Sequence, residues 1–113
     1  MEIKFIRKRL ADICNSEKAL VAEFGRDNAK KIKMRLNELY SVDNLSQISH
    51  LPPPRRHALH NDRDGQYSVD VKQPYRLIFE PANNPLPVNA EGNVDLTKIT
   101  DITILEVVDY HGE

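Results

Sequence analysis

The clearest hydrophobic pattern lies near the C-terminus, where residues 102–108 are apolar or β-branched at every position except Glu106. A short run of this kind is typical of a strand that is buried on both faces in the centre of a sheet. We therefore predict a strand over residues 101–108. The three polar or aromatic side chains of residues 109–111 follow it directly, so a rigid strand would hold them at the edge of the sheet.

The N-terminal part of the chain predicts one strand and two helices. Residues 2–6 alternate polar and apolar side chains, as a half-buried strand does. Apolar residues then recur every three or four positions over residues 10–24, with a break near Ser16, which could cap a new helical turn, and an end at Gly25. Asp27 is the expected N-cap of the second helix. Its buried stripe is predicted to be Ala29, Ile32, Leu36 and Leu39.

The remaining chain predicts a meander of four strands. The prolines at 52–54 would stop any helix and hold an extended segment. Strands are expected over residues 55–62, 67–72, 75–80 and 101–108, with a hairpin turn at Asp64-Gly65 and a long loop over 81–96. The whole chain, residues 1–113, is thus predicted to be a single α+β domain. Its first strand and two helices would pack on one face of a mainly antiparallel sheet, leaving the other face for function.

Length and composition support one small folded domain. The chain has 113 residues, of which 40% are hydrophobic and 29% are charged. No apolar run approaches the roughly 18 residues that a membrane helix needs, and the N-terminus lacks the apolar core of a signal peptide. The single cysteine, Cys14, falls on an apolar helix face and is expected to be a buried structural thiol. These features predict a cytoplasmic protein without a membrane segment.

The small net charge of −1 hides an asymmetry between the two halves. Residues 1–63 carry 13 Lys and Arg against 8 Asp and Glu, whereas residues 64–113 carry 3 against 9. The basic half could contact a polyanion or could simply present solvated helix faces, and both interpretations stay open. The nearly neutral total argues against strong nonspecific binding to nucleic acid.

Candidate chemistry comes from histidines and cations on the predicted strands. His57 and His111 lie on or just after strands that we expect to be neighbours, and imidazoles with pKa values near 6.5 can exchange protons at neutral pH. Cationic side chains occur on the same strands. Together these groups match metal-independent RNA cleavage, in which a base deprotonates the 2′-hydroxyl, an acid protonates the leaving 5′-oxygen and cations stabilise the charge on phosphorus. The cations are Arg55, Arg56, Arg63, Lys72 and Arg76.

Simpler structural explanations compete with this chemistry. Arg76 lies inside an apolar strand, where a cross-strand ion pair with Asp70 or Glu106 would explain it equally well. His50 and His60 are expected to be surface residues. The sequence contains no glycine-rich phosphate loop, serine nucleophile elbow, zinc-ligand spacing or dinucleotide fingerprint, which disfavours the usual hydrolases and oxidoreductases. We expect neither a metal ion nor a cofactor.

Four short segments resemble one known protein family. They are residues 14–18 (CNSEK), 62–69 (DRDGQYSV), 75–81 (YRLIFEP) and 106–111 (EVVDYH). In this order they are similar to the HigB-like branch of the RelE/ParE toxin superfamily, some members of which carry the label plasmid maintenance system killer protein. The resemblance spans nearly the whole chain and implies the RelE-like toxin fold.

The resemblance also implies a function and a set of partners. The chain would be the toxin of a type II toxin–antitoxin system, its partner would be a HigA-like helix-turn-helix antitoxin, and it would reach DNA only through that complex. It would act as a ribosome-dependent mRNA endoribonuclease (an mRNA interferase), without a metal ion. By position, the catalytic residues would be His57, Asp109, Tyr110 and His111, and the contacts to substrate phosphate or ribosomal RNA would come from Arg63, Lys72 and Arg76.

Within that set, the two histidines are the acid–base candidates, and their individual roles stay open. Asp109 would accept a proton or orient a neighbour, and Tyr110 would stack on a base or donate a hydrogen bond. Two other functions remain as alternatives: a ParE-like inhibitor of a topoisomerase, and a catalytically inactive module that binds an antitoxin. The Asp-Tyr-His end favours the nuclease, whereas the slightly acidic charge favours the inactive module.

Overall fold

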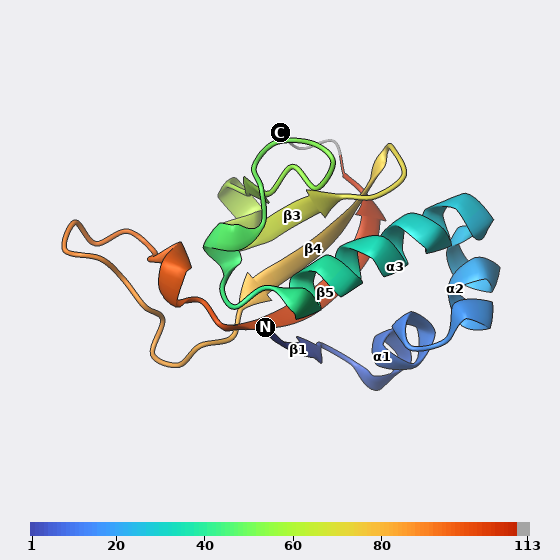
Figure 1. Cartoon of the computed structure of the whole chain (residues 1–113), viewed down its shortest axis with the longest axis horizontal. Helices are drawn as coiled ribbons and strands as arrows, with labels where there is room; N and C mark the ends of the chain where they lie inside the picture. The colour runs from blue at the N-terminus through green and yellow to red at the C-terminus, as the bar shows by residue number, and fades with distance from the viewer. Residues whose placement is uncertain (111–113) are drawn as a thin grey trace.

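A computed structural model describes residues 1–110 as helices packed on one face of a mixed sheet (Figure 1). Within these residues the sheet has five strands in the order β1-β5-β4-β3-β2. The predicted α+β fold class is therefore confirmed. None of the helices in this part of the chain is both long and apolar enough to cross a bilayer. The elements are β1 (Glu2–Phe5), α1 (Lys8–Cys14), α2 (Glu17–Phe24), α3 (Arg26–Ser41), β2 (His57–Ala58), β3 (Tyr67–Asp70), β4 (Tyr75–Pro81) and β5 (Asp101–Asp109).

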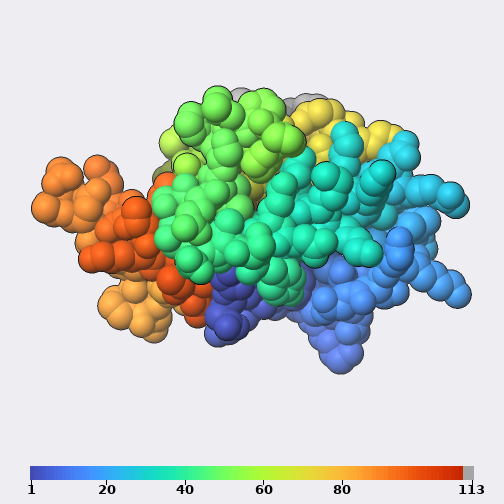
Figure 2. Space-filling view, in the orientation of Figure 1, coloured from blue at the N-terminus to red at the C-terminus, as the bar shows by residue number. Residues whose placement is uncertain are grey.

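The long last strand, β5, organises the sheet as its sequence predicted. It pairs in parallel with β1 on one side and antiparallel with β4 on the other. The strands β2 to β5 form the expected meander, and β1 joins the same sheet beside β5. The loop between β4 and β5, residues 82–100, projects from the body of the molecule (Figure 2) and exposes the side chains of Leu86 and Val88.

The main core lies between the helices and the sheet. The four residues of the predicted stripe on α3 are all buried there, and Leu77 and Phe79 meet them from β4. A second, smaller cluster lies on the opposite face of the sheet, which we call the second face. It consists of Leu59, Ile78 and Leu105, with Val108 and Tyr110 packed against it. Leu59 comes from residues 59–66, so this segment, which we call the covering segment, folds over part of the second face.

The junction between α2 and α3 differs from the sequence prediction. The first predicted helix is divided into α1 and α2, so the structure has three helices here, and the second predicted helix is α3, which starts at Arg26. Gly25 is both the C-cap of α2 and the N-cap of α3. Asp27 was predicted to be this cap, but it lies in the first turn of α3. The backbone φ of Gly25 is +82°, a left-handed value that glycine reaches without a steric penalty. One residue can therefore separate the two helices, and a side-chain cap is not used.

The triple-proline segment forms a turn instead of the predicted extended segment. The backbone N–H of Arg55 donates to the carbonyl of Leu51 at 3.1 Å, which closes a turn over residues 52–54. Proline fixes its own φ but leaves ψ free to turn. The prolines therefore follow the helical part of the chain, as expected, but their own backbone forms a turn and is not extended.

The strand predicted over residues 55–62 is reduced to His57–Ala58. Arg55 and Asn61 have φ values of +47° and +58°, and a left-handed residue at each position interrupts extended backbone. Asn61–Arg63 then forms a short 3-10 turn, η2. The prediction of a full strand here is wrong because alternation of side chains does not reveal where the backbone turns.

The break predicted near Ser16 is confirmed and gives a testable stability effect. Ser16 is the N-cap of α2, and its Oγ accepts a hydrogen bond from the backbone N–H of Ala19 at 3.1 Å. Ser16→Ala should lower the free energy of unfolding by about 1 kcal/mol, because that N–H loses its acceptor. Urea denaturation measures the change. Ser41→Ala, at the exposed end of α3, is the control and should change stability by less than about 0.5 kcal/mol. Equal stabilities of the two variants would contradict the assigned cap.

Candidate functional site

A β-bulge in β5 determines which side chains reach the second face. Ile78 of β4 pairs with Glu106, but Phe79 pairs with Ile104, so Leu105 is an extra residue on β5. Without this extra residue, strict alternation after Ile104 would point Glu106 into the main core. The bulge therefore turns the carboxylate of Glu106 to the second face.

Two arginines lie over the ring of Tyr110 at the end of β5. The guanidinium carbon of Arg63 is 5.5 Å from the ring centroid, and that of Arg76 is 5.9 Å from it. Both distances suit cation–π contacts. Because Tyr110 packs on the small apolar cluster of the second face, the ring has a firm support. We call Arg63, Arg76, Tyr110 and Glu106 the Tyr110 cluster.

Arg63 ties the covering segment to β5. Its Nη2 donates to Oε2 of Glu106 at 2.6 Å, and its Nη1 donates to Oε1 of Gln66 at 2.9 Å. The first bond is a short charge-assisted one that connects residues 43 positions apart in the sequence. The guanidinium of Arg63 is thus fixed beside Tyr110, with a carboxylate already bound to it.

Arg76 lies deeper and is held by Asp70 on the neighbouring strand. Its side chain is only 11% exposed, and its Nε is 3.8 Å from Oδ1 of Asp70. Arg55 binds the same carboxylate through two hydrogen bonds of 2.7 and 3.1 Å, and these bonds raise the pKa of Arg55 above its ordinary value. The cross-strand pair between Arg76 and Asp70 is therefore present. Among residues 1–110, no acceptor lies within hydrogen-bond distance of the buried Arg76 Nε.

His57 shares the second face but lies away from Tyr110. One row of paired residues crosses the sheet from β2 to β5. It consists of His57, Ser68, Ile78 and Glu106. The prediction that the strands of His57 and His111 are neighbours is wrong, because β3 and β4 separate β2 from β5 by three strand spacings, about 14 Å. The ring of His57 instead meets that of His60 edge to face, with centroids 6.4 Å apart.

The other predicted site residues are dispersed. Lys72 lies beside α3, with its Nζ 3.6 Å from a carboxylate oxygen of Asp27, and is not part of the Tyr110 cluster. Asp109 is exposed and pairs with Tyr75 in the ladder; alternation along β5 points it away from the face that carries Tyr110. His111 lies outside the described residues.

Sequence reasoning assigned no site role to Glu106 or Gln66, the two residues that hold Arg63. A signal existed for Glu106, which is the one charged residue in an otherwise apolar or β-branched run. A charge at such a position indicates a partner, because an unpaired carboxylate on a half-covered face is costly. No comparable signal marks Gln66, which lies in a polar turn.

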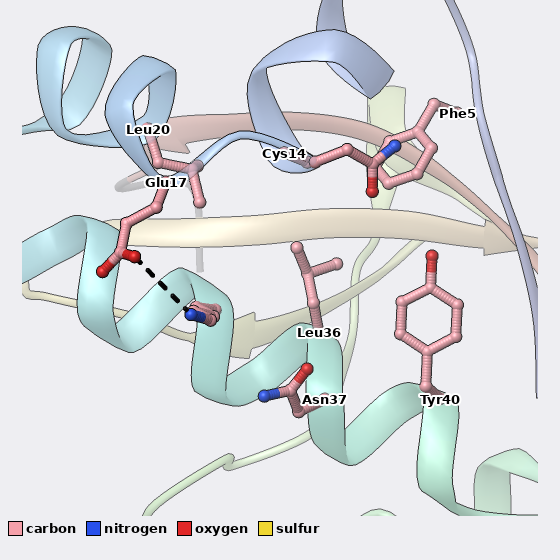
Figure 3. A pocket seen from close by; sticks show the side chains of 9 residues that line it. Phe5, Cys14, Glu17, Leu20, Leu36, Asn37 and Tyr40 are labelled. Atoms are coloured by element: carbon pink, nitrogen blue, oxygen red, sulfur yellow. Dashed lines mark ion pairs between the residues drawn. The ribbon is translucent and has the colours of Figure 1, made fainter.

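A separate hollow lies on the helical side of the molecule, between α1, α2 and α3 (Figure 3). Phe5, Cys14, Asn37 and Tyr40 are among its lining residues, and Glu17 pairs with Lys33 at its rim at 3.9 Å. Burial raises the pKa of the Cys14 thiol to about 11, so the thiol is protonated at neutral pH. Cys14 is half-buried, less than the fully buried position expected from the sequence.

No model of a protein family matches the sequence. Among solved structures, the chain is similar to a YoeB/ParE toxin from Agrobacterium tumefaciens, with a TM-score of 0.57. The chain has the fold of this toxin. The likeness covers 98% of this chain and 100% of the toxin chain at 9% sequence identity, so it concerns the path of the backbone and assigns no role to a side chain. The toxin fold implied by the sequence resemblance is confirmed at this level, and the HigB-like branch is a finer prediction.

Proposed function

We propose that this chain is the toxin of a type II toxin–antitoxin pair and that it cleaves messenger RNA on the ribosome without a metal ion. Two independent features support this proposal. One is the toxin fold found by structural comparison. The other is the HigB-like order of the four sequence segments, which ends in Asp-Tyr-His.

The observation that carries the proposal is the placement of two guanidinium groups beside Tyr110. Arg63 and Arg76 come from different elements, yet both lie within 6 Å of the same ring. Guanidinium groups bind the equatorial oxygens of a phosphodiester, and they stabilise the extra negative charge that develops during 2′-hydroxyl attack. A tyrosine ring beside them offers a stacking surface for a base and a phenol for hydrogen bonding.

The remaining roles follow from sequence position. His111 follows Tyr110 directly and is the proposed acid or base beside the phosphate, with Asp109 next to it to orient a neighbour or accept a proton. His57 belongs to the same face, but it is three strand spacings from β5, so we propose that it meets the RNA farther along the strand. Lys72, on the helical side, would contact ribosomal RNA. The partner would be a HigA-like antitoxin, and DNA would be bound only through the complex of both proteins.

Expression of the chain in bacteria that lack its antitoxin should arrest growth, and the purified chain should cut messenger RNA only when ribosomes are present. The cut should yield an upstream fragment with a 2′,3′-cyclic or 3′-phosphate end, because the 2′-oxygen is the nucleophile. Growth curves measure the arrest, primer extension locates the cut in the messenger RNA, and end-group analysis identifies the phosphate end that the cut leaves.

A matched substrate makes this test specific. A messenger RNA with a single 2′-deoxy nucleotide at the cleaved position should resist the enzyme, since the attacking hydroxyl is absent. Normal growth at verified expression, cleavage of the deoxy substrate, or efficient cutting of free RNA that requires a divalent metal ion would each refute the proposal.

A second function is favoured by one specific observation. The arginines of the second face are paired with carboxylates, Arg63 with Glu106 and Arg55 with Asp70, which reduces the positive charge available to RNA. A ParE-like inhibitor of a topoisomerase, or an inactive module that binds an antitoxin, needs no such charge. Inhibition of DNA supercoiling by gyrase without any RNA cleavage would identify the inhibitor. Antitoxin binding with neither activity would identify the inactive module.

A further inference from the structure

We infer that Glu106 is an internal competitor of the substrate phosphate: it holds Arg63 in the free chain, and an RNA phosphodiester takes its place. This inference rests on the proposed function and adds a form of regulation to the same site. In the free chain the Arg63–Glu106 pair would keep the covering segment closed over the second face.

The geometry of the pair supports such a competition. The contact between Arg63 Nη2 and Glu106 Oε2 is 2.6 Å long, and the two side chains are 24% and 41% exposed. A carboxylate and a phosphodiester present similar pairs of oxygens to a guanidinium fork. Because the pair is partly open to solvent, an incoming anion can reach Arg63 without first unfolding the surrounding structure.

The position of Glu106 is otherwise difficult to explain by packing. Its neighbour across the ladder is Ile78, and Leu105 beside it belongs to the apolar cluster. An apolar residue at 106 would fit this cluster, whereas a carboxylate requires a partner. The bulge directs this carboxylate to Arg63, so the ion pair depends on the local structure of β5.

The two arginines of the cluster would respond differently when a phosphate displaces Glu106. Arg76 is anchored on β4 and held by Asp70, while Arg63 lies in η2 of the covering segment. When a phosphate replaces Glu106, Arg63 can move with its segment and bind the anion together with Arg76 beside Tyr110. One anion is exchanged for another, so Arg63 is never left without a counter-charge. The exchange also keeps the free chain from binding RNA indiscriminately.

The test compares the wild type with Glu106→Gln, which keeps the shape of the side chain and removes its charge. The probe is a single-stranded RNA oligonucleotide made of 2′-O-methyl nucleotides, which cannot be cleaved through a 2′-hydroxyl. Glu106→Gln should bind this RNA about tenfold more tightly, as measured by fluorescence anisotropy at low salt. Hydrogen exchange at the amides of residues 59–66 should become faster in the same variant without RNA, because the segment has lost its tie to β5.

Two controls separate competition from a general effect of charge. Asp62→Asn removes the same charge from an exposed position next to Arg63 and should leave RNA affinity nearly unchanged. In an Arg63→Gln background, Glu106→Gln should no longer increase affinity, because the contested cation is gone.

Three results would overturn the inference. They are equal or weaker RNA binding by Glu106→Gln, a gain that persists in the Arg63→Gln background, and the absence of measurable RNA binding by every variant. A purely structural role for Glu106 predicts the first of these. Failure of the proposed function is a different observation, the absence of ribosome-dependent cleavage by the wild type, and it leaves the binding comparison interpretable.

Discussion

Arg76→Gln should reduce ribosome-dependent cleavage of messenger RNA by about 100-fold while the chain keeps its fold. Arg76 is nearly buried beside Tyr110, and no acceptor for its Nε lies within residues 1–110. Under the proposed function, this donor would meet the negative charge that develops in the transition state, and its loss would remove that stabilisation. The rate constant of cleavage, measured with saturating toxin and a single turnover of substrate, tests the effect.

The fold should survive this change because the carboxylate next to Arg76 keeps a partner. Arg55 binds Asp70 through two hydrogen bonds that do not involve Arg76. Thermal melting followed by circular dichroism checks that the variant is folded. The matched control is Arg9→Gln, since Arg9 is exposed on the helical side, where it pairs with Glu23 at 3.5 Å. A variant Arg76→Gln that is folded and cleaves at the wild-type rate would remove Arg76 from the mechanism.

The parts of the fold that the sequence predicted are those in which side-chain periodicity reports burial. The stripe Ala29, Ile32, Leu36 and Leu39 is buried on α3, and the run ending in Val108 is β5, an interior strand with a neighbouring strand on each side. In both cases many apolar residues act together, so a shift of one position would expose several of them. The meander from β2 to β5 follows from the tendency of successive strands to pair, which holds here even across the long loop of residues 82–100.

The parts that the sequence did not predict depend on single backbone choices. Left-handed conformations at Arg55 and Asn61 shorten β2 to two residues, and the bulge at Leu105 moves Glu106 to the second face. None of these positions is a glycine, whose presence would have signalled an unusual φ. Contacts distant in sequence, such as Leu59 on Ile78, stabilise these conformations, and local patterns do not contain that information.

The candidate site also has features that the sequence predicted and features that depend on the tertiary structure. Arg63, Arg76 and Tyr110 were predicted as individual residues, and the structure brings them together at the end of β5. The separation of His57 from β5 follows from strand order, because a four-stranded meander places its first and last strands at opposite ends. The carboxylates that bind the arginines are also a product of the tertiary structure. The sequence thus predicted the chemical groups of the cluster and Asp70 as a partner of Arg76, but not the pairing of Arg63 with Glu106.

Asp70→Asn should lower the free energy of unfolding by about 3 kcal/mol, more than any surface substitution in this chain. The Asp70 side chain is 15% exposed and accepts two hydrogen bonds from Arg55, with Arg76 on its other side. An asparagine has nearly the same shape but no charge, so it leaves two guanidinium groups near the sheet without a carboxylate. The backbone of Asp70 also binds Arg35 and Pro54, and these bonds persist in the variant.

Asp62→Asn provides the matched control for this prediction, because it makes the same chemical change at an exposed position of η2. Its stability should stay within about 0.5 kcal/mol of the wild type. Chemical denaturation at neutral pH measures both variants, and equal midpoints would show that Asp70 does not hold the sheet to the segment after the prolines. A loss confined to Asp70→Asn would instead show that this carboxylate, which binds Arg55 and lies next to Arg76, stabilises the fold. Stability and the proposed chemistry would then depend on the same side chain.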